Sequence, residues 1–237
     1  MAAPLISAAI TNARYTLNES TATFWTDAEL LVYANNGLKD LWRAIIDLHQ
    51  GHFLTIDTTA VSLAASTATL TGTPADLFRV ELLEVRDQTT ANTVQNLTFS
   101  PRSINHPDFS AARGLGAVDP NGREIYFAVT GAGSPVSTPS IQVAPMISAA
   151  VNLRLTYTPT LGAKAASDAN PIPGDSDHAI EAWIIAHARA REREDRSPDP
   201  EWLAIYATDK KNLLVSLTPR QTQEPDYAEA LFESYWS

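Results

Sequence analysis

The 237-residue sequence contains no cysteine. Disulfide scaffolds, thiol nucleophiles and cysteine-based zinc or iron–sulfur sites are therefore excluded. It also has no run approaching the ~18 apolar residues that a bilayer-spanning helix needs. The mildly apolar stretch 2–10 has no Lys or Arg before it, which makes it a poor signal peptide. These absences predict a protein of a reducing cytoplasm that has no membrane partner.

Basic charge is scarce as well. Seventeen Lys and Arg stand against 27 Asp and Glu, so the formal net charge is −10, and no block of basic residues occurs. A protein whose main task is to grip phosphates would show the opposite balance. With 44% hydrophobic and 19% charged residues, the composition is that of an ordinary globular chain.

The charged residues are distributed unevenly along the chain. Arg154 is the only charged residue in 125–163, and the stretch 58–75 has none. Both stretches are rich in Thr, Ser, Val and Pro, whereas charge concentrates where apolar residues recur with helical spacing. The distribution predicts two helical blocks, one at each end, on either side of a β-rich middle.

The first block contains two predicted helices. Pro4 suits the first turn of a helix that continues to about Leu17. Thr26 and Glu29 form a capping-box pattern at the start of the second helix, whose apolar stripe continues to Ile46. We expect Gly51 to close that helix.

The middle block predicts short strands and turns. Alternation of apolar and polar residues indicates strands at 52–56, 60–63, 68–71, 79–87, 125–129, 141–143 and 151–157. In the 79–87 strand, Val80, Leu82 and Val85 should face inward. The remaining expectations are a helical turn at 75–78, a short helix within 101–109 and a flexible loop at 111–118.

The closing block predicts two more helices after a segment rich in Ala, Pro and Ser. Asp175 or Ser176 would cap the first, which runs to Arg196. Ser197 would cap the second, with Pro198 at its first position and Pro219 ending it. The predicted organisation is a helical body of residues 1–51 and 172–217, a β-rich insertion of residues 52–161, a linker at 162–171 and a C-terminal arm at 218–237. This is an α+β fold in which the N- and C-terminal helices form a bundle.

Residue patterns typical of catalysis or metal binding are weak. His49 and His52 lie three apart but at opposite sides of a predicted helix end. No Gly-x-Ser-x-Gly occurs, and the acid pairs Asp175/Asp177 and Asp199/Glu201 stand at helix starts, where the helix dipole already favours them. We therefore expect no enzyme activity, no catalytic residue, no metal and no cofactor.

Four arginines lie in the last part of the predicted helix that contains His187. Three acids are threaded between Arg189, Arg191, Arg193 and Arg196. A nucleic-acid patch would lack those acids. Alternating charge indicates a solvated helix end or salt bridges between subunits.

The last eleven residues are unusually aromatic. They contain Tyr227, Phe232, Tyr235 and Trp236, together with Leu231, although aromatics make up only 8% of the chain. Exposed clusters of large apolar side chains are costly, so this segment either folds back on its own domain or docks onto another chain. Both alternatives remain open from the sequence.

The order of these motifs resembles that of a known family. The pattern begins with Trp25-Thr-Asp-Ala-Glu-Leu-Leu-Val-Tyr-Ala-Asn-Asn-Gly37 and continues with Thr73-Pro-Ala-Asp-Leu-Phe-Arg79. Arg154-Leu-Thr-Tyr-Thr-Pro-Thr-Leu161 ends the β region, and Ile172-Pro173 leads into the helix from Ala179 to Arg191. Together these resemble the head-to-tail adaptor proteins of tailed bacteriophages over residues 20 to 217.

The resemblance implies a structural virion protein at the head–tail junction, assembled in the host cytoplasm. Such proteins form a ring, here of twelve copies, that attaches to the portal protein, extends the DNA channel and docks tail or nozzle proteins. DNA passes through the lumen without specific binding. The likeness assigns portal contact to the aromatic arm, at Tyr227, Leu231, Phe232, Tyr235 and Trp236. The subunit contacts would fall on Arg189, Arg191, Arg193 and Arg196.

Two other functions stay open. A tail-completion or tail accessory protein would show the same blocks but bind tail proteins rather than portal. A glycan-binding or glycan-cleaving module would use the Thr-rich β region and would need exposed aromatics on its strands. Tyr126, Phe127 and Tyr157 instead have the pattern of core residues.

Overall fold

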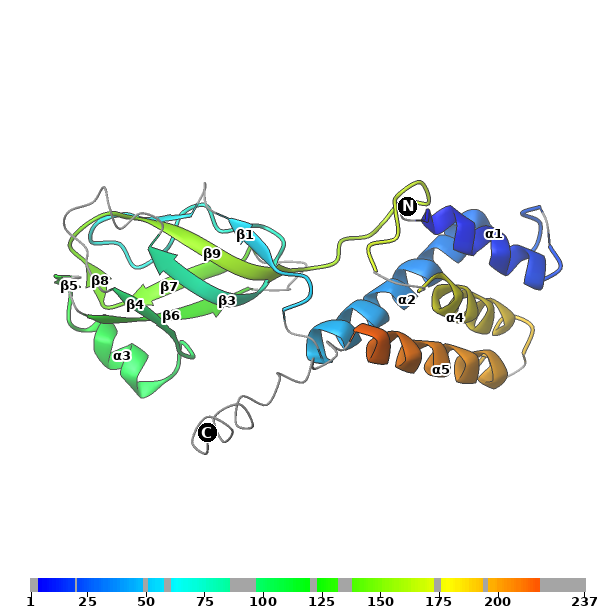
Figure 1. Ribbon diagram of the computed structural model, residues 1–237. Coiled ribbons are helices and arrows are strands. Elements are labelled where there is room, and N and C mark those ends of the chain that lie inside the picture. The colour runs from blue at the N-terminus through cyan, green and yellow to red at the C-terminus, as the bar shows by residue number, and fades with distance from the viewer. Residues whose placement is uncertain are drawn as a thin grey trace, which may run out of the picture. The chain divides into compact units, whose positions relative to one another are not determined.

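The computed structural model describes residues 4–19, 21–48, 51–57, 61–85, 97–119, 123–131, 138–172, 176–193 and 196–217. The chain divides into two compact units, with boundaries after residues 50 and 162. One unit is built from both ends of the chain and the other from its middle (Figure 1). The protein therefore has mixed α and β structure with the helices largely segregated from the sheets.

Four of the described helices belong to the unit formed by the chain ends. They are α1 (Ile6–Thr16), α2 (Asp27–Leu48), α4 (Asp177–Arg189) and α5 (Pro200–Leu217). Helix α4 packs against the other three and buries seven of its 13 residues, so it is the centre of this unit. Helix α5 buries only Tyr206 and Leu213 among its 18 residues.

The predicted capping box is confirmed at the start of α2. The amide of Thr26 donates to Glu29 Oε2 at 3.0 Å, and the amide of Glu29 donates to Thr26 Oγ1 at 3.2 Å. The apolar stripe is confirmed too, because Leu30, Leu38 and Ile45 are fully buried. The helix ends at Leu48, and Gly51 lies in a turn beyond the two undescribed residues 49 and 50.

The predicted starts of α1 and α5 are wrong, whereas α4 starts after Ser176 as expected. Helix α1 begins after Leu5, so Pro4 precedes the helix, and its carbonyl accepts from the amide of Asn170 at 2.8 Å. Ser176 precedes α4 but makes no capping bond, because its hydroxyl is held by Asn170 and Ile172. Helix α5 begins at Pro200, and the capping side chain is Asp199 rather than Ser197. At the starts of α4 and α5, contacts outside the helix decide whether a side chain can act as the cap.

The segment predicted as a linker hydrogen-bonds to the helices. The amides of Ile6 and Ser7 donate to the carbonyls of Asp168 and Ala166 at 3.0 and 2.9 Å. The Asn35 side chain donates to the Lys164 carbonyl at 3.0 Å and accepts from the Lys164 amide at 2.7 Å. The bonds from Ile6 and Ser7 satisfy first-turn amides of α1 that no helical carbonyl can reach.

The middle unit contains the described strands and one short helix. The strands are β1 (Thr55–Asp57), β2 (Ser62–Leu63), β3 (Leu77–Val85), β4 (Thr98–Pro101), β5 (Ala117–Val118), β6 (Glu124–Thr130), β7 (Ser140–Ala144), β8 (Met146–Ile147) and β9 (Val151–Pro159), and the helix is α3 (Pro107–Arg113). Strand β9 pairs antiparallel with β1, β2 and β3, β6 joins β4 and β7 in a second sheet, and β5 pairs with β8.

Alternation along the strands creates two apolar layers in this unit. Leu153 and Leu155 of β9 pack with Ile125 and Phe127 of β6 in the main core. On the opposite face of β6, Ala128 packs with Phe109 of α3. Figure 1 shows α3 lying against the β4–β6–β7 sheet, so that this sheet is covered on both faces.

Several predictions in the middle of the chain need correction. Leu82 is 46% exposed rather than buried, because shifts in the β3–β9 register before Arg79 and before Leu82 break the alternation. Residues 75–76 form a turn that leads directly into β3 at Leu77. The short helix lies at 107–113, later than expected, and the predicted loop at 111–118 contains its end and strand β5.

Candidate functional site

The four arginines assigned to subunit contacts lie at and just after the end of α4. Arg189 is the last residue of the helix, Arg191 and Arg193 follow in the next turn, and Arg196 adopts a positive φ of 50°. The negative end of the helix dipole favours cations here. We refer to residues 189–196 as the arginine segment.

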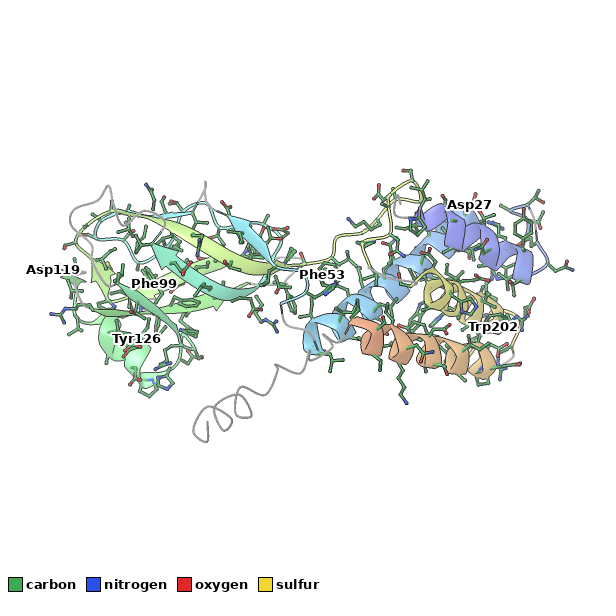
Figure 2. All side chains as sticks on the ribbon, viewed as in Figure 1. Asp27, Phe53, Phe99, Asp119, Tyr126 and Trp202 are labelled. Carbon is green, nitrogen blue, oxygen red and sulfur yellow. The ribbon has the colours of Figure 1, made fainter. Side chains whose placement is uncertain are left out.

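Arg189 is bound within its own chain. Its Nη1 lies 3.3 Å from Asp199 Oδ2, and its guanidinium lies 5.7 Å from the ring centre of Trp202 at the start of α5 (Figure 2). Asp199 also accepts from the amide of Glu201 at 3.0 Å, so one carboxylate both caps α5 and anchors the end of α4. The Arg189 charge is thereby already compensated.

Arg191 reaches the connection between α1 and α2. Its Nη1 donates to Glu29 Oε1 at 2.8 Å and to the carbonyl of Phe24 at 3.1 Å, and its guanidinium lies 4.7 Å from the Phe24 ring centre. Hydrogen bonds from the amide and hydroxyl of Thr26, together with the Arg191 charge, outweigh desolvation and lower the pKa of Glu29. The first two side chains of the arginine segment therefore hold the helices of one chain together.

The α1–α2 connection is folded around Glu19, which is 9% exposed. Its carboxylate accepts from the Thr23 amide at 2.6 Å, from the Trp25 amide at 3.1 Å, and from the Thr23 hydroxyl and the Phe24 amide. Burial alone would raise its pKa, but these donors lower the pKa of Glu19 to about 2. The same fold presents Trp25, which is 4% exposed, to α4.

Trp25 connects this loop to the arginine segment. Its indole Nε1 donates to the carbonyl of Ala188 at 3.0 Å, near the end of α4. The sequence analysis assigned no role to Glu19 and named Trp25 only as the first residue of the pattern at 25–37. The available signal was an acidic residue followed by several Ser and Thr residues, because such a carboxylate can accept hydrogen bonds from the amides and hydroxyls that follow it.

A cavity of about 280 Å³ lies where these parts meet, lined among others by Asn18, Trp25, Arg193 and Asp199. Arg189 and Glu192 line it too, so the two cations face two acids. The two positive and two negative side chains balance, so the cavity lining carries no excess charge to attract an anion.

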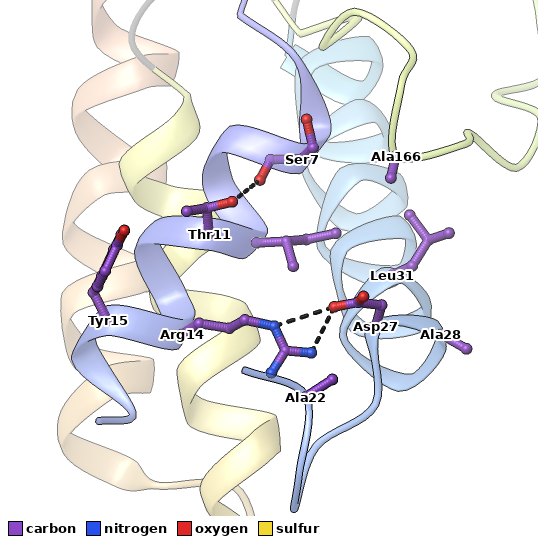
Figure 3. Close-up of a pocket in the computed structure, with 10 residues that line it drawn as sticks. Ser7, Thr11, Arg14, Tyr15, Ala22, Asp27, Ala28, Leu31 and Ala166 are labelled. Carbon is purple, nitrogen blue, oxygen red and sulfur yellow. Dashed lines mark hydrogen bonds and ion pairs between the residues drawn. The ribbon is translucent and has the colours of Figure 1, made fainter. Parts of the chain in front are cut away.

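A larger cavity, of about 430 Å³, lies between α1 and α2 (Figure 3). Arg14 borders it, with Nε and Nη2 donating to Asp27 Oδ1 at 3.1 and 2.6 Å, and Nη2 also donating to the carbonyl of Trp25 at 2.9 Å. Nη1 lies 3.5 Å from Glu19 Oε2. Because the guanidinium is shared by two carboxylates, this cavity has a structural ion-pair network at its wall.

Of the two histidines considered as metal ligands, His49 lies outside the described residues, and the His52 ring packs edge-on against Phe53 with 4.8 Å between ring centres. The other three histidines contact groups of their own chain. His178 Nδ1 lies 2.6 Å from Asp209 Oδ2, which links α4 to α5, and the His187 ring stacks on Trp183 at 4.3 Å between centres. His106 caps α3 by accepting from the Asp108 amide. Across the described ranges, no cluster of three or more His, Asp or Glu side chains is arranged to hold a metal ion.

Of the two acid pairs, Asp199 accepts from the amide of its companion Glu201 at the start of α5. Asp177 accepts from Asn170 Nδ2 at 2.6 Å, while its predicted companion Asp175 lies outside the described residues. The aromatic arm assigned to portal contact, Tyr227, Leu231, Phe232, Tyr235 and Trp236, lies outside them too. The structure thus brings the arginine segment together with Trp25 and Asp199, and adds nothing on the arm.

Comparison of the sequence with models of known protein families and with curated proteins finds no match. In the part of the chain that the structure describes, no helix is both long and apolar enough to cross a membrane.

Proposed function

We propose that this chain is a structural virion protein, the head-to-tail adaptor that forms a ring beneath the portal of a tailed bacteriophage. It attaches to the portal, lengthens the DNA channel and offers a docking surface to tail proteins. The observation that carries the proposal is the order of parts: helices from both chain ends pack into one unit, and the β unit of residues 51–162 is inserted between α2 and α4.

This arrangement suits a ring protein. A helical bundle can be repeated around an axis through its side faces, and an insertion between two of its helices leaves the helical core uninterrupted. The sparse burial of α5, with two buried residues in 18, leaves a helix face that a neighbouring copy or another segment can cover.

Arg193 and Arg196 of the arginine segment support the proposed subunit contact. The side chains of Arg193 and Arg196 are exposed, and Arg189 and Arg191 form ion pairs with Asp199 and Glu29 of their own chain. In a ring, the exposed arginines would face acids of the next copy, and opposite charges at the rim would set the register of the contact.

The acidity of the chain fits a DNA conduit. Twelve copies at −10 each give a ring of about −120, so a lumen lined by acids repels phosphates rather than trapping them. Genome passage requires DNA to slide without specific binding. Salt bridges between subunits then have to offset the mutual repulsion of the copies.

The aromatic arm supplies the portal contact in this proposal. Truncation after Pro219 should leave a folded protein that no longer binds purified portal in a sedimentation assay. A full-length variant with Phe232→Ser and Trp236→Ser separates loss of the anchors from loss of chain length, and it should also fail to bind. Undiminished portal binding by either protein would overturn the assignment.

A tail-completion protein is the main rival, and the same assay addresses it, because such a protein would bind tail components and leave portal in solution. The three aromatic residues considered for the glycan alternative give it no support. Phe127 and Tyr157 are 4% and 6% exposed, and Tyr126 is half-buried beside α3 with the Arg102 guanidinium 5.2 Å from its ring centre (Figure 2). None of these three rings is displayed as a sugar platform.

A further inference from the structure

An apolar groove of about 450 Å³ lies between the end of α2 and residues 206–215 of α5. Leu48 forms one wall, and Ala207, Leu214 and Val215 form the other. Leu48 and Val215 are 57% and 65% exposed. Large aliphatic side chains so exposed at facing positions mark a surface that gains free energy when it is covered.

The floor of the groove is firmly built. Tyr206 donates to Asp40 Oδ2 of α2, and Lys210 Nζ lies 2.6 Å from the same oxygen. Burial and the Asp40 carboxylate raise the pKa of Tyr206, so its hydroxyl stays a donor. This cluster fixes the spacing of α2 and α5, and the groove is therefore a feature of the packed helices. Lys211 is exposed at its rim.

The chain itself continues from this place. Helix α5 ends at Leu217, two residues after Val215, and 20 residues follow in the sequence. They include four acids, Glu224, Asp226, Glu229 and Glu233, against a single Arg220, and they carry the aromatic arm. Tyr227, Leu231 and Tyr235 recur every four residues, a spacing typical of segments that fill apolar grooves. The segment thus matches the groove in apolar character and is opposite in charge to its lysine rim.

We propose that residues 218–237 of the same chain bind in the groove between α2 and α5 when the protein is free. The apolar arm covers Leu48 and Val215, and its acids lie against Lys210 and Lys211. A tethered segment has an effective concentration on the order of a millimolar, so an intrinsic dissociation constant of about 0.1 mM keeps the groove about nine-tenths occupied.

The inference holds for the free chain whether or not it binds a portal. One consequence of the inference rests on the proposed function. The same aromatic residues cannot be in the groove and on the portal at once. Docking in the groove would shield the arm until a portal competes for it, which would limit premature self-association.

Cysteine cross-linking tests the proposal in the full-length protein, because the chain has no native cysteine. Lys211→Cys is combined in turn with Ala228→Cys, Ala230→Cys, Glu233→Cys or Ser234→Cys, and intramolecular disulfide formation under mild oxidation is followed by mass spectrometry. The matched control places the first cysteine at Val32, an exposed residue of α2 that does not line the groove. In at least one groove variant, the intramolecular disulfide should form at least tenfold faster than in the control variant that carries the first cysteine at Val32.

A second pair of variants tests the groove itself. Added to the groove cysteine pair, Val215→Glu should abolish the faster disulfide formation. Val32→Glu, at a valine of similar exposure, should preserve it. Equal rates for all groove and control pairs would overturn the proposal. Disulfides that form only between chains would also overturn it, since a second copy would then supply the arm. No portal is present, so this outcome is independent of the portal-binding test.

Discussion

At the scale of single residues, Gly37 sets how closely α2 approaches α4. A Cβ at this position would lie 2.9 Å from Trp183 Cδ1 and 3.0 Å from Cγ, both in the rigid part of the indole. The ring cannot easily move away, because it stacks on His187 at 4.3 Å and meets Tyr206 edge-on at 4.8 Å between centres. Gly37 is therefore required by packing inside a helix, where glycine otherwise weakens the structure.

Gly37→Ala should destabilise the protein in spite of its better helix propensity. Overpacking costs about 1–3 kcal/mol, against a propensity gain of up to about 1 kcal/mol, so the free energy of unfolding should fall by about 1 kcal/mol. Chemical denaturation measures it. Asn36→Ala, at the exposed neighbouring position, is the control and should be neutral or slightly stabilising. A Gly37→Ala protein more stable than wild type would refute the close contact.

Glu19 should make the stability of the helical unit depend on pH. Its pKa is lowered from 4.5 to about 2 on folding, so its charged form contributes stability above pH 4.5 that is lost as the pH falls toward 2. Glu19→Gln should lower stability at neutral pH and flatten the decline between pH 4.5 and 2. Denaturant titrations across this range measure both effects. Glu192→Gln, at an exposed carboxylate, should leave the profile unchanged, and an unchanged slope in Glu19→Gln would contradict this role.

At the scale of elements, the two units have separate apolar cores. The main β core contains residues between Val61 and Tyr157 only, while Ile184 of α4 is fully buried in the helical unit. Each core can therefore lose packing without directly removing contacts from the other.

Leu153→Ala and Ile184→Ala should each cost about 2–5 kcal/mol, because each removes a fully buried aliphatic side chain. Hydrogen exchange followed by mass spectrometry should show faster exchange in 51–162 for the first variant and in the helices for the second. Val32→Ala, at an exposed site, should change neither. Faster exchange throughout the chain in either core variant would mean that the units unfold as one.

Elements with strong local signals could be predicted from the sequence. The capping box at Thr26 and the strands β6, β7 and β9 match the expected ranges closely, because cap chemistry and alternation act within a few residues. The start of α5 could not be predicted, since Ser197 and Asp199 both suit a cap. The choice depends on the Asp199 amide donating to the distant carbonyl of Ala186 at 3.0 Å.

The site was less accessible to sequence reasoning than the fold. The arginine segment was found from its composition, but its partners are set by tertiary structure: Arg191 and Glu29 are 162 residues apart. The groove of Leu48 and Val215 was missed for the same reason, because its walls come from helices at opposite ends of the chain. Leu82 was misassigned because a register shift in a strand leaves no mark in the hydrophobic pattern.

At the scale of the whole molecule, the exposed arginines provide a test of assembly that spares the fold. Arg193→Glu with Arg196→Glu should weaken subunit association, while the ion pairs of Arg189 with Asp199 and of Arg191 with Glu29 stay in place. Analytical ultracentrifugation measures the assembly and circular dichroism the fold. Lys39→Glu, an exposed charge reversal on α2, should assemble normally. Unimpaired rings in the double variant would remove the arginine segment from the subunit contact.

The central claim is that twelve copies form a ring on the portal, and the mass of the assembly tests it most directly. Mass photometry of the full-length protein mixed with purified portal should show a complex heavier than the portal by about 310 kDa, the mass of twelve 25.7-kDa chains. Electron microscopy of that complex should show an added ring with a central opening. A chain that stays monomeric, leaves the portal mass unchanged and forms no ring would contradict the account.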